Sequence, residues 1–352
     1  MPLVNAKCTN CGASLKVDNT KDASICEFCG SAYIVEKAIN NYNITNNNIN
    51  ANVVNIYGGN SADFIIRAGT LEKYNGASTD VVIPNTVTCI GPSAFKGCMG
   101  LKNVEIPNGV TKIGSSAFYG CSNLSSVTIP NSVTKIGKSA FLGCINLTSV
   151  TIPNSVTDIG DNVFRECSGL TNVTISINVS IISMHAFSAC RKLTSITIPN
   201  SVTRIASRAF YGCNNLESII IPNSVTKISS SAFQYCSCLN SVNIPNNVTE
   251  IGLSAFEGCS SLTNITIPHS VTKIGVNAFK DCLNLANIFD PNYSAHSEIY
   301  VGSLFYKKQQ EHKKQQEQVA EWKHQTKCQH CGGQFKGLFK KVCSQCGKPK
   351  DY

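Results

Sequence analysis

Apolar and polar residues follow one pattern between Val81 and Pro291, and the pattern repeats every 23 residues. Each copy reads Ala-Phe-x-x-Cys-x-x-Leu-x-x-Val-x-Ile-Pro-x-x-Val-x-x-Ile, with small variations. The phenylalanines that mark the nine copies are Phe95, Phe118, Phe141, Phe164, Phe187, Phe210, Phe233, Phe256 and Phe279. A fixed period in this range predicts a solenoid, in which each copy forms one coil that stacks on its neighbours.

The pattern within one copy predicts its local structure. Residues 124–129 alternate between apolar and polar, with Val and Ile favoured, which is typical of a strand. Pro130 ends this strand because it has no backbone N–H to donate. We expect Val133 and Ile136 to return to the interior, Gly137 to turn the chain, and a turn or short helix to open at Phe141.

The sequence of the repeat resembles that of a known protein family. Residues 126–144 read SVTIPNSVTKIGKSAFLGC, and further copies begin at Leu147 and Leu193. This resembles the leucine-rich repeat of BspA-like bacterial proteins, and the resemblance covers roughly residues 64 to 291. It implies a β-rich solenoid, residues 81–291 here, that acts as a binding and interaction scaffold rather than as an enzyme.

Two Cys-x-x-Cys pairs precede the repeats, and a glycine follows each pair. Zinc favours four tetrahedral ligands of this kind, and the two-residue spacer lets both sulfurs of a turn reach one ion. We therefore predict a structural zinc ribbon in residues 1–37; the alternative is a thioredoxin-like redox pair. The predicted ligands are Cys8, Cys11, Cys26 and Cys29.

The same arrangement returns at the other end of the chain. Residues 328–352 contain two more Cys-x-x-Cys pairs, each followed by glycine, and predict a second zinc ribbon. The predicted ligands are Cys328, Cys331, Cys343 and Cys346. The sequence thus predicts two structural zinc ions. Sites with four thiolates leave no open position for a reacting water, so we expect them to fold the ends rather than to catalyse a reaction.

The remaining segments differ in composition from the repeats. The Asn-rich residues 38–62 read as a flexible linker, or alternatively as a strand laid along another surface. Two short apolar runs in residues 63–80 predict a hairpin that caps the first coil, and residues 292–306 are expected to cap the last. Residues 307–327 are rich in Lys, Gln and Glu without Gly or Pro, and predict a polar basic helix.

Nine cysteines form a column at the repeat spacing, which raises the question of disulfides, metal binding or redox sensing. Neighbouring coils would bring these cysteines within reach of one another. The column is interior, however, and a free cysteine behaves as a small hydrophobic residue, so we favour a packing role. The column consists of Cys98, Cys121, Cys144, Cys167, Cys190, Cys213, Cys236, Cys259 and Cys282.

Two features inside the repeats allow a functional or a neutral interpretation. One repeat position carries Lys or Arg in five copies, but Asp158, Ile181 and Glu250 interrupt the line, so a solvated face is favoured over a groove for a polyanion. The fifth copy departs most from the pattern: Ser176 replaces the expected Pro, and Ile181, Met184 and His185 replace Lys or Ser types. This indicates either a contact site or drift in a tolerant repeat. The basic residues of the line are Lys112, Lys135, Arg204, Lys227 and Lys273.

Positive charge is concentrated at the carboxyl end. The formal net charge is +9, while only 14% of the residues are charged. Residues 305–352 hold eleven lysines against four acidic residues, a net +7, so the rest of the chain is close to neutral. Lys336, Lys340 and Lys341 lie beside aromatic residues, a combination that can grip phosphates and bases, so nucleic-acid binding is the alternative function.

The sequence points to binding rather than catalysis. It shows no Gly-rich phosphate loop, nucleophile elbow or recognisable catalytic dyad, and we expect no enzyme. It has no apolar stretch long enough to span a membrane and no apolar leader in its first seven residues. Thiolate ligands and many free cysteines fit a reducing compartment, so we expect a cytoplasmic protein–protein interaction scaffold. A secreted surface protein, by analogy with the family, would need another export route.

Overall fold

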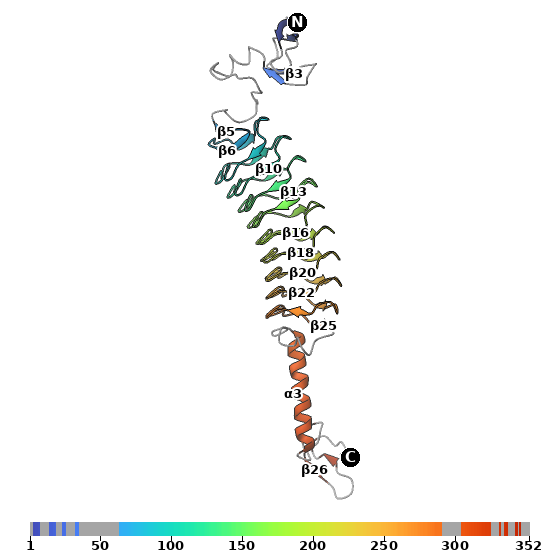
Figure 1. Ribbon diagram of the computed structural model, residues 1–352. Coiled ribbons are helices and arrows are strands. Elements are labelled where there is room, and N and C mark those ends of the chain that lie inside the picture. The colour runs from blue at the N-terminus through green and yellow to red at the C-terminus, as the bar shows by residue number, and fades with distance from the viewer. Residues whose placement is uncertain are drawn as a thin grey trace.

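The computed structural model describes a solenoid, residues 63–290, and a helix, residues 304–324. In the two end regions it describes short segments only, namely residues 3–7, 14–18, 23–25, 32–34, 331, 334–336, 342–343 and 345. Between β5 and β25 the coils stack into an elongated body (Figure 1). Coils are numbered here by their phenylalanine, from coil 1 with Phe95 to coil 9 with Phe279.

One side of the solenoid, called here the long-strand face, is built from strands of three residues. Its strands form three parallel sheets, of three, two and five strands, in which the residues that pair are 23 apart in the sequence, as in Ser126 with Asn103. The strands are β7 (Asp80–Val82), β9 (Asn103–Glu105), β11 (Ser126–Thr128), β13 (Ser149–Thr151), β15 (Asn172–Thr174), β17 (Ser195–Thr197), β19 (Ser218–Ile220), β21 (Ser241–Asn243), β23 (Asn264–Thr266) and β25 (Asn287–Phe289).

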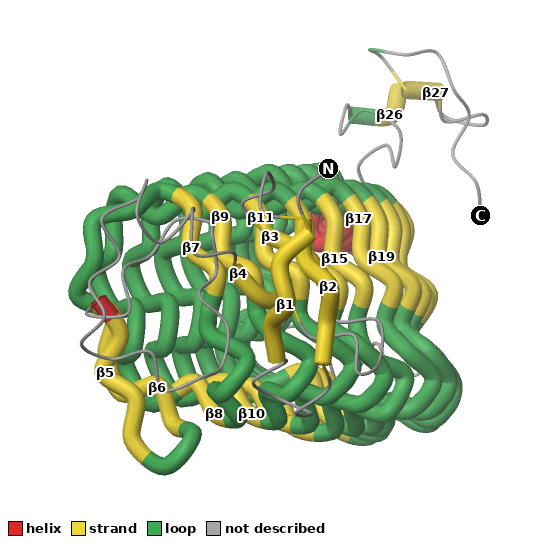
Figure 2. Tube along the Cα trace, turned by 90° about the horizontal axis from the view of Figure 1, so that it is seen from above, coloured by secondary structure: helices red, strands yellow, loops and turns green. Residues whose placement is uncertain are grey.

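The other side, called the short-strand face, is built from strands of two residues that also pair in parallel. Seen along the stack, the two sets lie on different sides of the coils (Figure 2). The sequence pattern predicted only the first set, because two residues are too short to show a period of two. The strands are β8 (Cys89–Ile90), β10 (Lys112–Ile113), β12 (Lys135–Ile136), β14 (Asp158–Ile159), β16 (Ile181–Ile182), β18 (Arg204–Ile205), β20 (Lys227–Ile228), β22 (Glu250–Ile251) and β24 (Lys273–Ile274).

The core is a column of phenylalanine rings that runs through all nine coils. The rings of neighbouring coils are stacked, with centroids between 4.9 Å and 5.7 Å apart and planes within 13° of one another. Each of these rings is less than 2% exposed. A single coil cannot bury its own ring, so this column couples each coil to the next. The solenoid of about nine leucine-rich coils that the sequence predicted is confirmed.

Glycine serves the coils in two ways. Two residues after each phenylalanine the backbone is left-handed, and Gly97, Gly120 and Gly143 occupy this position with φ between 70° and 75°. Gly137 instead serves the packing between coils, because a Cβ there would lie 2.5 Å from the Ser115 nitrogen of the preceding coil. The predicted turn does begin at Gly137, whose carbonyl accepts the Ala140 N–H at 3.3 Å, and the close approach between coils is a second reason for glycine there.

A hairpin precedes the first coil. Strands β5 (Phe64–Arg67) and β6 (Thr70–Tyr74) pair antiparallel, and β6 continues the short-strand face by pairing with β8. The hairpin turn has positive φ at both Ala68 and Gly69, as a tight two-residue turn requires. The ring of Tyr74 lies 5.2 Å from those of Phe64 and Phe95, so the hairpin extends the aromatic column.

The helix α3 (Leu304–His324) lies past the last coil (Figure 1), and each of its ends falls three residues before the predicted range of 307–327. Its middle part is polar and exposed, with an ion pair between Lys313 and Glu317 at 4.0 Å. In the described part of the chain, no helix has both the length and the apolar character that a membrane crossing requires.

The end regions contain three short antiparallel hairpins within the described residues. Before the solenoid, β1 (Leu3–Lys7) pairs with β2 (Ser14–Asp18), and β3 (Ala23–Ile25) pairs with β4 (Ala32–Ile34). After it, β26 (Phe335–Lys336) pairs with β27 (Val342–Cys343). The predicted linker 38–62 lies outside the described residues, as do residues 292–303 of the predicted cap.

Candidate interaction surfaces

The long-strand face presents an ordered array of small polar side chains. In each strand from β9 to β23 the middle residue is buried and the two flanking residues are exposed. A shallow depression of about 510 Å³ lies over coils 3 to 5 and is lined by hydroxyls such as those of Thr128, Ser149 and Thr151. Ile220, 76% exposed, is the apolar exception in the middle of this face.

The short-strand face carries five basic and two acidic residues, and each acidic residue pairs with a lysine of the neighbouring coil. Lys135 pairs with Asp158 in the next coil, and Lys227 pairs with Glu250 at 2.8 Å. These pairs join residues that are direct neighbours in the sheet. The basic line is thus interrupted by carboxylates bound to its own lysines, which supports a solvated face rather than a groove for a polyanion. Arg204 makes no ion pair within residues 63–290.

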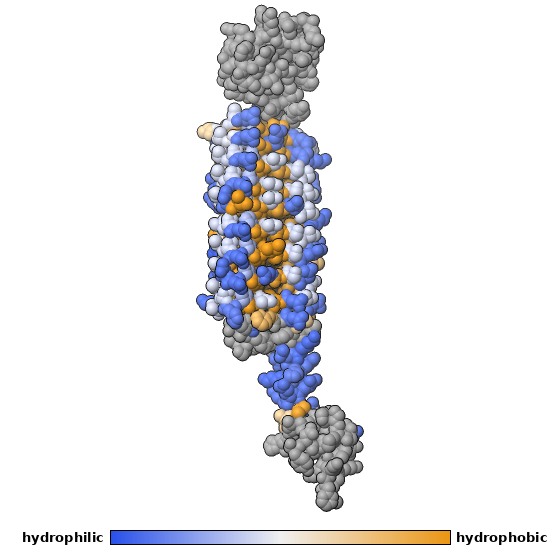
Figure 3. Space-filling view, turned by 90° about the vertical axis from the view of Figure 1, so that its right-hand side faces the viewer, coloured by the Kyte–Doolittle hydropathy of each residue, from blue (hydrophilic) through white to orange (hydrophobic). Residues whose placement is uncertain are grey.

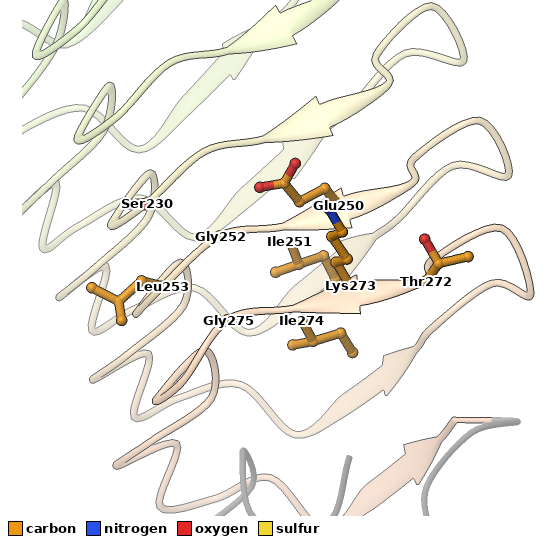
Figure 4. Close-up of a pocket in the computed structure, with 9 residues that line it drawn as sticks. All are labelled: Ser230, Glu250, Ile251, Gly252, Leu253, Thr272, Lys273, Ile274 and Gly275. Atoms are coloured by element: carbon orange, nitrogen blue, oxygen red, sulfur yellow. The ribbon is translucent and has the colours of Figure 1, made fainter. Parts of the chain in front are cut away.

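A second depression, of about 460 Å³, lies where this face ends at coils 8 and 9 (Figure 4). Its lining includes Glu250, Leu253, Thr272 and Lys273, and Lys273 extends alongside Glu250. The corner of the solenoid seen in Figure 3 carries a stripe of apolar atoms between polar columns.

The cysteine column is buried and free of disulfides. Each thiol from Cys121 to Cys282 donates to the carbonyl of the phenylalanine 26 residues earlier, at 3.1 Å to 3.2 Å. Burial raises the pKa of the Cys121 thiol to about 12, which keeps it protonated. The predicted packing role is confirmed for these residues. Cys98, in the first coil, is half-buried.

Coil 5 interrupts the short-strand face. Strands β14 and β16 belong to separate sheets, whereas every other pair of neighbouring short strands is hydrogen-bonded. At the interruption the Ser183 hydroxyl donates to the Ile159 carbonyl at 2.5 Å, where the neighbouring coil uses the Gly160 N–H. The Ser176 hydroxyl donates to the Val156 carbonyl at 2.7 Å, a bond that serines of other coils also make. The Asn178 amide donates to the Asn154 carbonyl at 2.7 Å. Coil 5 is therefore joined to coil 4 by side chains on the short-strand face and by backbone bonds elsewhere, such as the bond from the Phe164 N–H to the Ala186 carbonyl at 2.9 Å.

His185 is one of two residues of this coil with positive φ, the other being Ala189. The φ of His185 is 55°, in the left-handed region, and its buried Nδ1 has no hydrogen-bond partner. Burial lowers the pKa of His185, and the nearby Arg165 and Arg208 guanidiniums lower it further, while Asp161 acts in the opposite direction. The imidazole is therefore neutral near pH 7. The sequence singled out Ser176, Ile181, Met184 and His185, but it missed Ile177 and Ser183, which the same 23-residue alignment exposes.

Most of the predicted zinc ligands lie outside the described residues, namely Cys8, Cys11, Cys26, Cys29, Cys328 and Cys346. Cys343 ends strand β27, and Cys331 is half-buried. Among the residues that the structure describes, no group of three or more His, Cys, Asp or Glu could hold a metal ion. Of the predicted nucleic-acid contacts, Lys336 lies in β26, while Lys340 and Lys341 are outside the described residues.

Comparison with solved structures finds other repeat proteins of bacteria. A leucine-rich repeat protein from Bacteroides ovatus is 24% identical, with 72% of this chain and 98% of that chain covered and a TM-score of 0.37. A leucine-rich cell surface protein from Faecalibacterium prausnitzii is 26% identical, with 69% and 97% covered and a TM-score of 0.36. The leucine-rich repeat protein of T. pallidum is 24% identical, with 71% and 99% covered and a TM-score of 0.41.

A comparison with curated proteins finds no match. The sequence does match a family described as the BspA type leucine-rich repeat region, in two overlapping segments, residues 72–194 and residues 180–307. These segments include the whole column of nine phenylalanines and both sheet faces. Because the match spans more than half of its length, the chain belongs to the BspA-type leucine-rich repeat family.

Proposed function

We propose that this chain is a non-enzymatic, intracellular scaffold that binds a protein partner through its solenoid. The observation that carries the proposal is the construction of the solenoid itself. Ten parallel strands, β7 to β25, hold an exposed array of side chains on a continuous aromatic core. Stacked repeats of this kind create extended surfaces that suit recognition of another macromolecule, and leucine-rich repeat proteins as a class bind proteins.

The two ends of the chain are proposed to be structural zinc ribbons that hold two zinc ions in total. The four Cys-x-x-Cys pairs support this, because four thiolates at this spacing suit tetrahedral zinc. The short hairpins β1–β2, β3–β4 and β26–β27 are of the size that a zinc ion stabilises in small modules. A cytoplasmic location is proposed on the same chemistry, since thiolate ligands persist in a reducing compartment.

The decisive experiment is capture of partners by the full chain from a native lysate, in nuclease-treated and untreated halves. The scaffold proposal expects one protein in stoichiometric amount from both halves. It also expects that protein to protect amides of the solenoid from hydrogen exchange. Protection confined to the end regions, with an unprotected solenoid, would contradict the proposal.

A nucleic-acid-binding function through the carboxyl end is the rival, and Lys336 beside Phe335 in β26 is the observation that favours it. Binding of this kind weakens steeply with salt, because each phosphate contact releases counterions. Replacing Lys336, Lys340 and Lys341 by Gln would then weaken binding of a single-stranded oligonucleotide and flatten its salt dependence. Unchanged binding in this variant would remove the rival.

A further inference from the structure

Coil 5 carries an apolar segment on a face where the other coils are mainly polar. At the position of Ile177 the other eight coils have Asn or His, and at the position of Ile181 they have charged residues apart from Cys89. At the position of Met184, apolar side chains recur only in Pro92 of coil 1 and in coils 8 and 9. Coil 5 is thus the coil in which all three positions are apolar.

These side chains face the solvent. Ile177 is 61% exposed and Met184 is 40% exposed. Ile181 is half-buried and points outward, because its neighbour Ile182 points into the core. None of the three is needed to fill the interior, where Val179 and Ile182 occupy the usual repeat positions. Three outward apolar side chains within eight residues of one coil make this segment a candidate contact surface.

The segment is held in place. The side-chain bonds of Ser176, Asn178 and Ser183 tie coil 5 to the carbonyls of coil 4, and the Ile177 nitrogen donates to the Asn154 side chain at 3.1 Å. The apolar side chains are therefore displayed on an anchored backbone. A surface that is ordered before binding loses less entropy when a partner docks.

The charges beside the segment are asymmetric. Toward coil 4, Asp158 is paired with Lys135, whereas Asp161 accepts the Met184 N–H at 3.1 Å and makes no ion pair within residues 63–290. Toward coil 6, Arg204 is the direct sheet neighbour of Ile181, and it is exposed. Arg208 is also exposed, and neither arginine makes an ion pair within residues 63–290. Two unpaired guanidiniums beside one unpaired carboxylate, Asp161, leave the balance of charge at this surface positive.

We propose that Ile177, Ile181, Met184, Arg204 and Arg208 form the docking surface of the scaffold, here called the coil 5 surface. This rests on the proposed function and deepens it by naming the surface and the chemistry of the partner. The partner is a protein segment that places apolar side chains next to carboxylates. Apolar anchors beside arginines are the arrangement in which a few residues supply most of the binding energy. The free guanidiniums select acidic sequences, because carboxylates match their planar donors.

The test uses the full chain and an array of synthetic peptides of equal length that combine apolar residues with acidic, basic or uncharged polar ones. The apolar variant, Ile177→Asn with Ile181→Lys and Met184→Ser, installs residues that other coils carry at the same positions, so the fold is expected to tolerate it. The charge variant is Arg204→Gln with Arg208→Ser. Ile220→Thr is the matched control, because it removes an exposed apolar side chain from the long-strand face.

The acidic apolar peptides are expected to bind, and the apolar variant to bind them at least about tenfold more weakly, the loss expected when anchor residues are removed. The charge variant is expected to bind the acidic peptides more weakly and to make their binding less sensitive to salt. Ile220→Thr is expected to change neither the affinity nor its salt dependence. Equal binding of acidic and basic peptides, or unchanged binding in the apolar variant, would overturn the proposal. Unchanged thermal unfolding by circular dichroism would show that each variant is folded.

Two other occupants would also contradict it. Self-association that is lost in the apolar variant, measured by sedimentation, would assign the coil 5 surface to a second copy of the chain. An RNA oligonucleotide that displaces the acidic peptides at this surface would assign it to nucleic acid. If a captured protein instead protects the long-strand face from hydrogen exchange, the scaffold function stands and the coil 5 surface fails. If the solenoid captures no protein, both the scaffold function and the coil 5 surface are refuted.

Discussion

At the scale of single residues, the backbone conformation of each coil is set by two left-handed positions around its phenylalanine. Serine or asparagine fills the first of these positions in most coils, and glycine fills the second in five. Four coils place other residues at the second position: Glu166, Ala189, Tyr235 and Asp281. A side chain in this region costs roughly 1–2 kcal/mol, so these coils are intrinsically strained.

Ala189→Gly is expected to raise the free energy of unfolding by about 0.5–1 kcal/mol. Relief of the left-handed strain is partly offset by the larger entropy of glycine in the unfolded chain. The reverse change, Gly212→Ala, is the matched control, since a Cβ there would meet nothing within 4 Å and only the φ of 68° opposes it. It should destabilise by a similar amount in urea unfolding. A neutral result for both would show that this position does not strain the coil.

His185 predicts a pH dependence. Its pKa in the folded protein lies below the unfolded value of about 6.5, so the unfolded chain binds a proton more readily as the pH falls. The contribution of neutral His185 to stability is therefore fully present above about pH 6.5 and is lost as the pH falls toward the pKa of the folded protein. His185→Asn should reduce the loss between about pH 7.5 and about pH 5.5. Asn occupies the same left-handed position as Asn162 and Asn277, so the fold accepts it.

The urea midpoint of both proteins at the two pH values measures this effect. Arg165, Arg208 and Asp161 are the charged groups that act on the imidazole, and all three remain in the variant. The difference between the two proteins thus reports His185 alone. Parallel loss of stability in both would place the sensitivity elsewhere.

At the scale of elements, each coil is stabilised mainly by the aromatic column. Phe210 is fully buried, and its ring stacks on Phe187 at 5.5 Å and on Phe233 at 5.3 Å. Phe210→Ala is expected to lower the free energy of unfolding by roughly 3–5 kcal/mol, because a cavity is left between two coils. Ile220→Thr, on the surface, should change it by less than about 0.5 kcal/mol. Urea unfolding monitored by circular dichroism distinguishes the two.

The cysteine column predicts the order in which thiols react. Cys238 is exposed, whereas the thiols of Cys121 to Cys282 in the column are buried and protonated. A thiol reagent should therefore label Cys238 in the folded protein and reach the column only during unfolding. Mass spectrometry of peptides after brief labelling checks this. Early labelling of Cys190 or Cys213 would show that the coils open in the native state.

The sequence predicted the elements that depend on a local pattern of residues. The column of phenylalanine rings that begins at Phe95 follows from the 23-residue spacing alone. Each ring can be buried only against the equivalent rings of the coils above and below it. The two-residue strand Lys112–Ile113 was missed, because it is defined by pairing with other coils. The turn at Gly137 was predicted, but its packing role was missed, since a close approach between backbones is visible only in three dimensions. At coil 5, the roles of Ile177 and Ser183 could be recognised only from the exposure of the first and the hydrogen bond of the second.

At the scale of the whole molecule, the proposed zinc ions and the solenoid should be independent. The purified chain is expected to contain two zinc ions by elemental analysis. Their removal by a chelator should unfold the ends, because binding free energy of roughly 10–16 kcal/mol folds such modules. The solenoid has a core of its own, so its thermal transition should persist. One zinc ion, or none, would refute one or both ribbons, and a collapsed solenoid would show that the parts depend on one another.

The interruption between β14 and β16 has a mechanical consequence. Coils couple only to their neighbours, so a stack that is pulled at its two ends yields first where a boundary is weakest. On the short-strand face this boundary lies between coils 4 and 5, where the Ser183 hydroxyl makes the hydrogen bond that the Gly160 N–H makes in the neighbouring coil. On the long-strand face β13 pairs with β15 across this boundary, and the gaps in pairing lie one boundary earlier and one later. Under tension coils 4 and 5 should therefore separate first along the short-strand face while the other face still holds them, so that the stack bends open there before it parts.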